Sequence, residues 1–255
     1  MSKLPKENQF LDLSDYGRPA ARIIAKLFLN TSVTPIHVTL GFIISGCLAI
    51  YCILLEQHWV AALLLVLKSI LDAVDGELAR LKNRPSHVGR YLDSIADFIL
   101  NLMIILAIWY VYDSSLFLAF LAILSIELQG TLYNYYYVIL RNKYKGDTTS
   151  RIFEKKAPIA FKGEKQSTVN RLFNLYHLFY GPFDKVIHWL DPKAVVDRKL
   201  PNWFMTLVSI FGLGFQLLII GLMMVVDLGQ FIIPFFIGYS LIIPVFIAIR
   251  IFINR

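Results

Sequence analysis

The sequence has little of what soluble or secreted proteins usually carry. Of its 255 residues, 17% are charged and two are cysteine, whereas a soluble domain has about 25% charged residues. Cys47 and Cys52 lie in one apolar segment and give no disulfide framework. The five histidines lack the spacing of a metalloprotease motif. The first twenty residues lack an apolar core and a cleavage site, so we expect no signal peptide.

What the sequence does have is apolar residues, which make up 57% of the chain. They are organised into six segments long enough to cross a bilayer, which takes about 20 residues of helix. These expected spans are 36–55, 57–81, 88–113, 115–141, 201–227 and 229–253. The predicted fold is therefore all-α: a polytopic membrane protein with six transmembrane helices.

The positive charge alternates with these segments. The turns around Glu56, Asp113 and Asp227 contain no Lys or Arg, whereas the stretch from Arg141 to Lys199, at the long fourth-to-fifth connection, holds thirteen of the 25 basic residues. Lys and Arg mark the cytoplasmic side of membrane proteins. We therefore expect both termini in the cytoplasm. Because the charge follows the topology, it gives no reason to expect a nucleic-acid partner.

We interpret the chain, residues 1–255, as one membrane domain. An N-terminal segment (1–33) is followed by spans one to four (34–141), a cytoplasmic connection (142–200) and spans five and six (201–255). An amphipathic interfacial helix is expected before the first span, because apolar and basic residues alternate at helical spacing. Its apolar face comprises Ala20, Ile23, Ile24, Leu27 and Phe28, opposite Arg18, Arg22 and Lys26.

The connection 142–200 is basic at first and aromatic from Leu172 to Leu190. We expect it to lie against the membrane surface. Its basic clusters either contact lipid headgroups or belong to a solvated loop, and the sequence favours neither.

Four carboxylates lie in two neighbouring spans. Asp72 and Asp75 are three residues apart, and Asp93 and Asp97 are four apart, so each pair occupies one helix face. Glu77 is on the opposite face and is left out of the site. Charges inside a span cost about 2.5–3.5 kcal/mol each on insertion scales, so they indicate function. Four facing carboxylates would repel one another unless hard divalent cations, which prefer oxygen ligands, neutralise them.

Buried ion pairs are the alternative for these acids. Arg80, Arg90 and Lys68 are the only basic residues nearby, too few to neutralise four carboxylates.

The residues between the acids complete a longer pattern, D-x2-D-G-x2-A-R-x8-G-x3-D-x3-D. Its eight fixed positions are Asp72, Asp75, Gly76, Ala79, Arg80, Gly89, Asp93 and Asp97. A chance match has a frequency of about one in 10⁸ per chain at average residue usage. The pattern resembles the signature of the CDP-alcohol phosphotransferases.

The resemblance implies a transferase of phospholipid synthesis. Such an enzyme moves a substituted phosphate from CDP-diacylglycerol or a CDP-amino alcohol to the hydroxyl of an alcohol and releases CMP. The four aspartates would hold one or two Mg²⁺ or Mn²⁺ ions at the cytoplasmic side, and Asp97 would also be the general base. Asp72 would also contact the donor nucleotide. Gly76 and Gly89 would let the nucleotide approach the backbone, Ala79 would keep that face small, and Arg80 would bind phosphate. A homodimer is also implied.

Two weaker positions follow from the resemblance. Ser86 lies where the family places a hydroxyl on the donor, and Thr34, Pro35 and Thr39 resemble the segment that enters the first span beside the nucleotide. Ile36 departs from the Asn or Asp usual there. Without the family, Thr34 is a helix N-cap and Pro35 a first-turn proline.

The acceptor site is harder to predict. By depth, Asn134 and Tyr137 in the fourth span could reach an acceptor. A polar, aromatic wall suits an amino alcohol, but tyrosines at a membrane interface are an equally good interpretation. Glu127 and Lys68 have similar depth, which predicts an ion pair between them. Alternatively, Lys68 screens the acidic site, or Glu127 binds a cationic acceptor.

A different function class stays open as the alternative: a small cation transporter that uses the four aspartates as its ion site. It predicts broken helices and repeats around the midplane, neither of which the sequence indicates.

Overall fold

The computed structural model describes residues 4–144, 154, 156–197 and 199–255, and within them every regular element is helical. This confirms the predicted fold class. The principal helices are α1 (Arg18–Phe28), α2 (Pro35–Leu54), α3 (His58–Leu81), α4 (His87–Val111), α5 (Leu116–Lys143), α6 (Gln166–Leu190), α7 (Asn202–Val208), α8 (Leu213–Val225), α9 (Ile232–Tyr239) and α10 (Ile242–Ile253). Short 3₁₀ turns join them: η1 (Lys6–Asn8), η2 (Leu13–Asp15), η3 (Pro192–Val195), η4 (Ser209–Phe211) and η5 (Gly229–Phe231).

Four stretches of helix are long and apolar enough to cross a membrane: α2, α4, α5 and the stretch Gly229–Ile253. The pair Asn202–Phe211 and Leu213–Val225 adds a fifth if it is one bent span. α3 has 24 residues and packs along α2, but Lys68, Asp72 and Asp75 make it too charged to qualify by composition. The protein is an integral membrane protein, and six spans stay a prediction.

The expected turns lie where the sequence places them. Glu56, Asn83, Asp113 and Asp227 have positive φ angles of 55°, 49°, 45° and 57°, and each lies between consecutive helices. This left-handed conformation reverses the chain, and Asn and Asp adopt it more readily than most residues. α2 and α3 pack against each other across the turn at Glu56, and α4 and α5 contact each other across the turn at Asp113.

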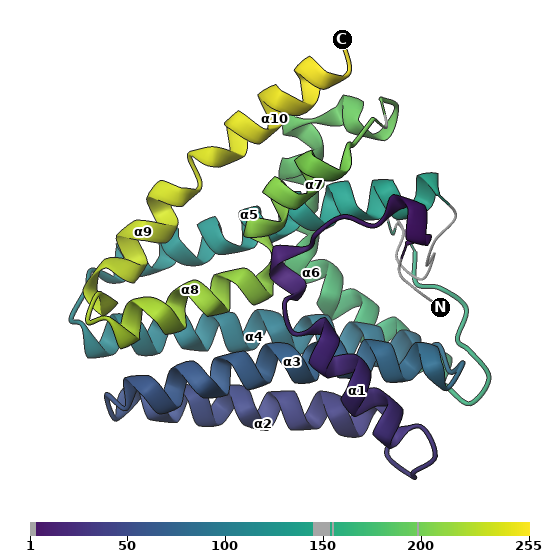
Figure 1. The fold of residues 1–255 in the computed structure, drawn as a ribbon, viewed down its shortest axis with the longest axis horizontal. Helices are drawn as coiled ribbons and strands as arrows, with labels where there is room; N and C mark the ends of the chain where they lie inside the picture. The colour runs from purple at the N-terminus through teal and green to yellow at the C-terminus, as the bar shows by residue number, and fades with distance from the viewer. Residues whose placement is uncertain (1–3, 145–153, 155, 198) are drawn as a thin grey trace.

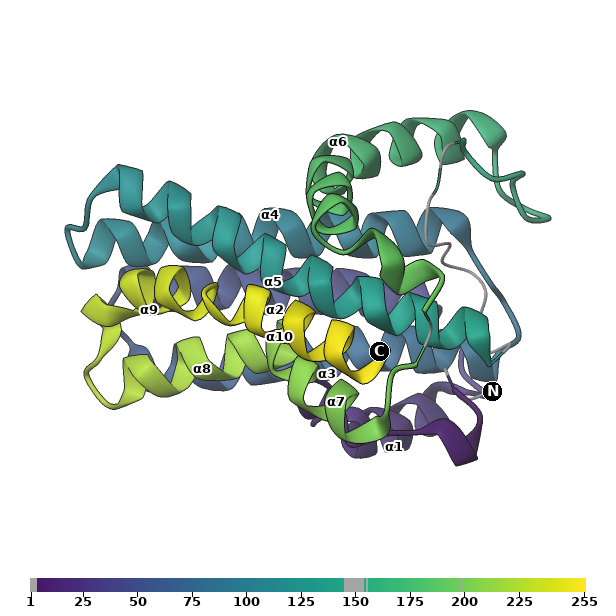
Figure 2. The same cartoon turned by 90° about the horizontal axis from the view of Figure 1, so that it is seen from above.

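The first half of the chain makes one layer. α2 packs against both α3 and α4, and α1 crosses α3 near the end that carries the aspartates (Figure 1). α8 packs on the other side of α3. α5 contacts α9, and α6 covers α4 and α5, as the second view shows (Figure 2). The aspartate pairs of α3 and α4 thus lie beside α2.

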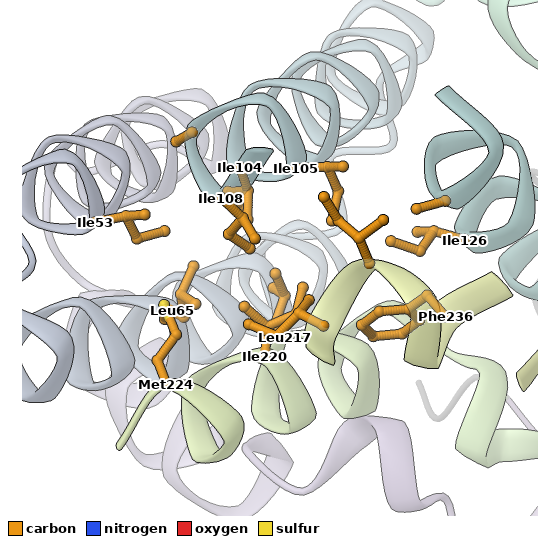
Figure 3. Close-up of a cluster of buried hydrophobic side chains, with 14 of the residues drawn as sticks. Ile53, Leu65, Ile104, Ile105, Ile108, Ile126, Leu217, Ile220, Met224 and Phe236 are labelled. Carbon is orange, nitrogen blue, oxygen red and sulfur yellow. The ribbon is translucent and has the colours of Figure 1, made fainter. Parts of the chain in front are cut away.

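The largest apolar core occupies the other half of the layer, away from the aspartates. Ile53, Leu65 and Ile104 of three different helices meet Leu217 and Phe236 there (Figure 3). Large apolar side chains also cover the outer surface, for example Leu63, Tyr110 and Phe117. A membrane protein can expose such residues to lipid. The apolar core and the aspartates therefore occupy different halves of the layer.

The predicted amphipathic helix is α1, but its apolar residues divide between two surroundings. Ala21 and Ala25 are fully buried against Val74 and Leu78 of α3. Ile23 and Leu27, by contrast, are 64% and 70% exposed. Small residues let α1 approach α3 closely, while its larger residues remain free to face lipid.

The connection 142–200 contains a long helix, α6. Its aromatic residues pack on α4: Phe179 stacks on Phe98 with ring centroids 4.6 Å apart, and the Tyr180 hydroxyl donates to the Ser94 carbonyl over 2.9 Å. Contact with the membrane surface stays a prediction. Residues 145–153, 155 and 198 of this connection lie outside the described residues.

The span expected at 201–227 corresponds to two helical stretches, Asn202–Phe211 and Leu213–Val225, which are bent by 51° relative to each other at Gly212. η2, from the N-terminal segment, packs against this point. A side chain at Gly212 would collide with the Ser14 side chain, and one at Gly214 with the Ser14 backbone. The two glycines therefore make room for the N-terminal segment.

Candidate active site

Three of the four motif carboxylates converge. Ligand oxygens of Asp72, Asp75 and Asp93 all lie within 4.8 Å of one another. Spacing along α3 aligns the first two on one face, and α4 brings the third against them. Among the described residues Asp97 does not join this group.

The surroundings of the three carboxylates fit a bound divalent cation. Thr39 Oγ1 donates to Asp75 Oδ2 over 2.8 Å, so α2 fixes one ligand. Asp93 Oδ1 is buried and has no hydrogen-bond partner within the described part of the chain. A buried oxygen without a partner is costly, and an Mg²⁺ or Mn²⁺ ion would satisfy it.

Asp97 is held by Lys68, which is buried at 0% exposure and forms an ion pair with Asp97 Oδ1. The predicted pair of Lys68 and Glu127 is therefore wrong. Glu127 is buried on α5 and is not the partner of Lys68. Equal depth on two spans did not specify how each helix is rotated, and α3 turns Lys68 toward α4. The alternative in which Lys68 screens the acidic site agrees with this contact.

Arg80 lies on α3, one helical turn after Gly76. Its Nη2 donates to Glu77 Oε2 over 2.7 Å, and Arg18 reaches the same oxygen at 3.3 Å. A Cβ added to Gly76 would be 3.5 Å from Arg80 Nη1, an ordinary contact. Packing within the chain therefore does not require a glycine at position 76, and the open backbone is available to a ligand. Ala79 is half-buried on the same helix.

Ser86 and Gly89 shape the start of α4. Ser86 Oγ accepts from the Gly89 N–H over 2.8 Å and donates to Glu164 Oε1 over 2.7 Å. The Val88 N–H also donates to Glu164, over 2.9 Å. A Cβ at Gly89 would be 3.1 Å from Ser86 Oγ, which is closer than an ordinary contact. Packing against Ser86 is therefore also a reason for a glycine at this position. The predicted donor hydroxyl is thus engaged by the connection.

The entry to α2 has a complete cap. Thr34 Oγ1 accepts from the His37 N–H over 3.4 Å, and the Thr34 N–H donates to His37 Nδ1 over 3.2 Å. Pro35 is the first residue of the helix. These contacts explain Thr34 and Pro35 structurally, whereas Thr39 contacts the acidic group directly.

The three predicted acceptor residues have different environments. Glu127 is buried and Asn134 is exposed. Tyr137 lines a cleft of about 190 Å³ together with Arg18, Arg22 and Glu77. Its ring is 5.6 Å from that of Phe10. Tyr137 therefore contacts residues of the N-terminal segment. The prediction, which used only the depth of Tyr137 in the fourth span, did not include these neighbours.

The connection brings a second carboxylate to α4 that sequence reasoning missed. Arg90 donates to both oxygens of Glu154, over 2.5 and 2.8 Å, and the Tyr91 hydroxyl donates over 2.6 Å. Glu154 and Glu164 together tie the connection to the first turn of α4, one turn before Asp93. No motif marks them, because their partners are far away in the sequence.

Comparisons with known proteins identify the family of the chain. Residues 32–196, more than half of the chain, match the family described as CDP-alcohol phosphatidyltransferase. An archaetidylinositol phosphate synthase from Pyrococcus horikoshii is 37% identical over 75 residues, which are 29% of this chain and 39% of that relative. The chain thus spans well under half the length of this curated relative. On the family match, the chain belongs to the CDP-alcohol phosphatidyltransferase family.

Proposed function

We propose that this protein is a divalent-metal-dependent transferase that moves a substituted phosphate from a CDP-linked donor to the hydroxyl of an alcohol acceptor. The convergence of Asp72, Asp75 and Asp93 within the family's motif carries the proposal. Three carboxylates on rigid helices suit the binding of a donor through its pyrophosphate, because a shared cation neutralises both.

The proposed reaction has one transfer step. The acceptor hydroxyl oxygen attacks the phosphorus that carries the donor's substituent, the bond from this phosphorus to the CMP oxygen breaks, and CMP leaves. Asp97 takes the hydroxyl proton. Arg80, fixed by Glu77, donates to a donor phosphate, and the open backbone at Gly76 admits the nucleotide. A bound Mg²⁺ or Mn²⁺ would stabilise the charge on the phosphate oxygens.

The donor and the acceptor stay proposals. The relative from Pyrococcus horikoshii is named for its product, archaetidylinositol phosphate, which favours a CDP-linked lipid donor and a polyol phosphate acceptor. We also propose that the active site faces the cytoplasm, since the basic residues collect at that end of the spans. The predicted homodimer has the resemblance as its only support.

The test is a direct assay of CMP release. Purified protein with Mg²⁺ is incubated with CDP-diacylglycerol or CDP-amino alcohols and a panel of acceptors that includes choline, serine and inositol phosphate. We expect one donor–acceptor pair to release CMP, excess EDTA to abolish the release, and Asp75→Ala to have the same effect. CMP release that persists in EDTA would rule out the metal mechanism. Donor-independent cation uptake into proteoliposomes would favour the transporter instead.

A further inference from the structure

Lys68 is a fully buried lysine inside the candidate active site. It lies one helical turn before Asp72, and its ammonium group pairs with Asp97 across from α3 to α4. It also lies 5.1 Å from the centre of the Phe42 ring, which α2 contributes and which is fully buried. Three helices thus enclose one positive charge and shield it from water.

The other two cations near the motif are already engaged. Arg80 pairs with Glu77, and Arg90 pairs with Glu154. Lys68 therefore differs from both, because its partner is one of the motif aspartates. The four motif carboxylates divide into three that converge and one, Asp97, that forms an ion pair with Lys68.

A second divalent cation between Asp97 and the other three acids would meet this ammonium group. The two positive charges would repel each other in a region of low dielectric constant. Within the described residues, Lys68 forms no ion pair besides the one with Asp97, and a buried charge without a partner is strongly destabilising. Displacement of Lys68 is therefore unfavourable.

We propose that Lys68 takes the place of a second metal ion, so that the chain binds one divalent cation, through Asp72, Asp75 and Asp93. In this arrangement Asp97 is not a metal ligand. Lys68 is a positioning residue: it holds Asp97 Oδ1 by a hydrogen bond and leaves Oδ2 for the acceptor's proton. The proposal rests on the proposed function for the role of Asp97, whereas the number of cations can be measured without catalysis.

The first experiment counts ions. Purified wild-type protein is titrated with Mn²⁺, with and without CMP, and bound ions are counted by equilibrium dialysis and electron paramagnetic resonance. We expect one Mn²⁺ per chain. Loss of a residue that only supports a metal ligand typically lowers metal affinity about 10–100-fold. Asp93→Asn removes a ligand and should lower the affinity for Mn²⁺ by more than this. Asp97→Asn should change the affinity for Mn²⁺ by less than about tenfold. Two ions per wild-type chain would overturn the proposal.

The second experiment removes the ammonium group. Lys68→Met should bind a second Mn²⁺ at Asp97, detected as a spin-coupled pair. Lys82→Met is the matched control, because Lys82 binds the Thr31 and Val33 carbonyls away from the site, and it should stay at one ion. A folded Lys68→Met protein that binds one ion would contradict the proposal.

If Lys68→Met does not fold, the double variant Lys68→Met, Asp97→Asn removes both charges and should restore folding. It should bind one ion, and two ions would overturn the proposal. CMP release in the same preparations separates this proposal from the proposed function. Wild-type protein that transfers and binds two ions would refute only the role of Lys68, and protein that binds one ion but never transfers would refute only the reaction.

Discussion

At the scale of single residues, Asp97 has two oxygens with different surroundings. Oδ1 is bonded to Lys68, and the carboxylate is 14% exposed, so part of it can reach a substrate. Asp97→Asn keeps an oxygen for Lys68 but cannot accept a proton. We expect turnover to fall by about 10²–10⁴ while donor affinity survives, measured by CMP release and calorimetry. Asp113→Asn, in an exposed turn, is the control. Wild-type turnover in Asp97→Asn would exclude this base.

Glu164 gives a pH-dependent contact. Burial raises the pKa of its carboxyl group, but hydrogen bonds donated by Ser86, Val88 and Phe161 outweigh burial and lower the pKa below its ordinary value. A lowered pKa stabilises the fold above the ordinary value of about 4.3. The contribution disappears as the pH falls through the lowered pKa.

We therefore expect thermal stability to drop more between pH 5 and pH 3 in the wild type than in Glu164→Gln. Thermal unfolding at several pH values measures this difference. Equal slopes for the two proteins would show that the contact with α4 contributes no pH-dependent stability.

At the scale of elements, the sequence predicts helices better than their interruptions. The spans expected at 36–55 and 57–81 are α2 and α3, displaced by at most one residue at either end, because long apolar segments between turn residues define helices locally. The break between α9 and α10 was not predicted. Gln129 of α5 donates to Ser240 and to the Phe236 carbonyl there, over 2.9 and 3.0 Å. A partner from another helix compensates this break, which no local pattern reveals.

The same distinction applies to the candidate site. Spacing alone predicts that Asp72 and Asp75 share a face, and they do. Which aspartate stands apart depends on Lys68, whose direction follows from the packing of three helices. The involvement of Glu154 and Glu164 required the path of the connection, which is a tertiary property.

One buried ion pair joins three elements. Arg250 of α10 pairs with Asp191, at the end of α6, and both side chains are 1% exposed. The Tyr136 hydroxyl of α5 also donates to Asp191, over 2.7 Å. Arg250→Met leaves the buried Asp191 carboxylate with the neutral Tyr136 hydroxyl as its donor. We therefore expect the free energy of unfolding to fall by about 3–5 kcal/mol. Unfolding in detergent measures this loss.

The double variant Arg250→Met, Asp191→Leu should regain part of this stability, because no charge remains buried. Recovery should be incomplete, since the Tyr136 hydroxyl then has no acceptor from Asp191. Additive losses in the double variant would show that the pair is not coupled.

At the scale of the whole molecule, the predicted orientation can be tested by labelling. Lys162 is exposed in the connection before α6. Lys162→Cys is made in a background without Cys47 and Cys52, since Cys47 is itself exposed. An impermeant maleimide should label this variant in inverted vesicles and not in intact cells, because basic connections face the cytoplasm. Asp113→Cys, in an exposed turn, is the control and should show the reverse. Labelling of the Lys162→Cys variant in intact cells would invert the topology.

The docking of the N-terminal segment has a consequence for biosynthesis. The Leu13 N–H donates to Ser209 Oγ, 196 residues later in the chain, and the Asn202 amide donates to the Gln9 carbonyl. A ribosome that adds about 5–20 residues per second makes Ser209 about 10–40 s after Leu13. Asp12 meets its partner Tyr133 sooner, 121 residues along. The partners of this segment therefore become available in two stages during translation: Tyr133 of α5 is made first, and the partners on α7 and η4 follow later.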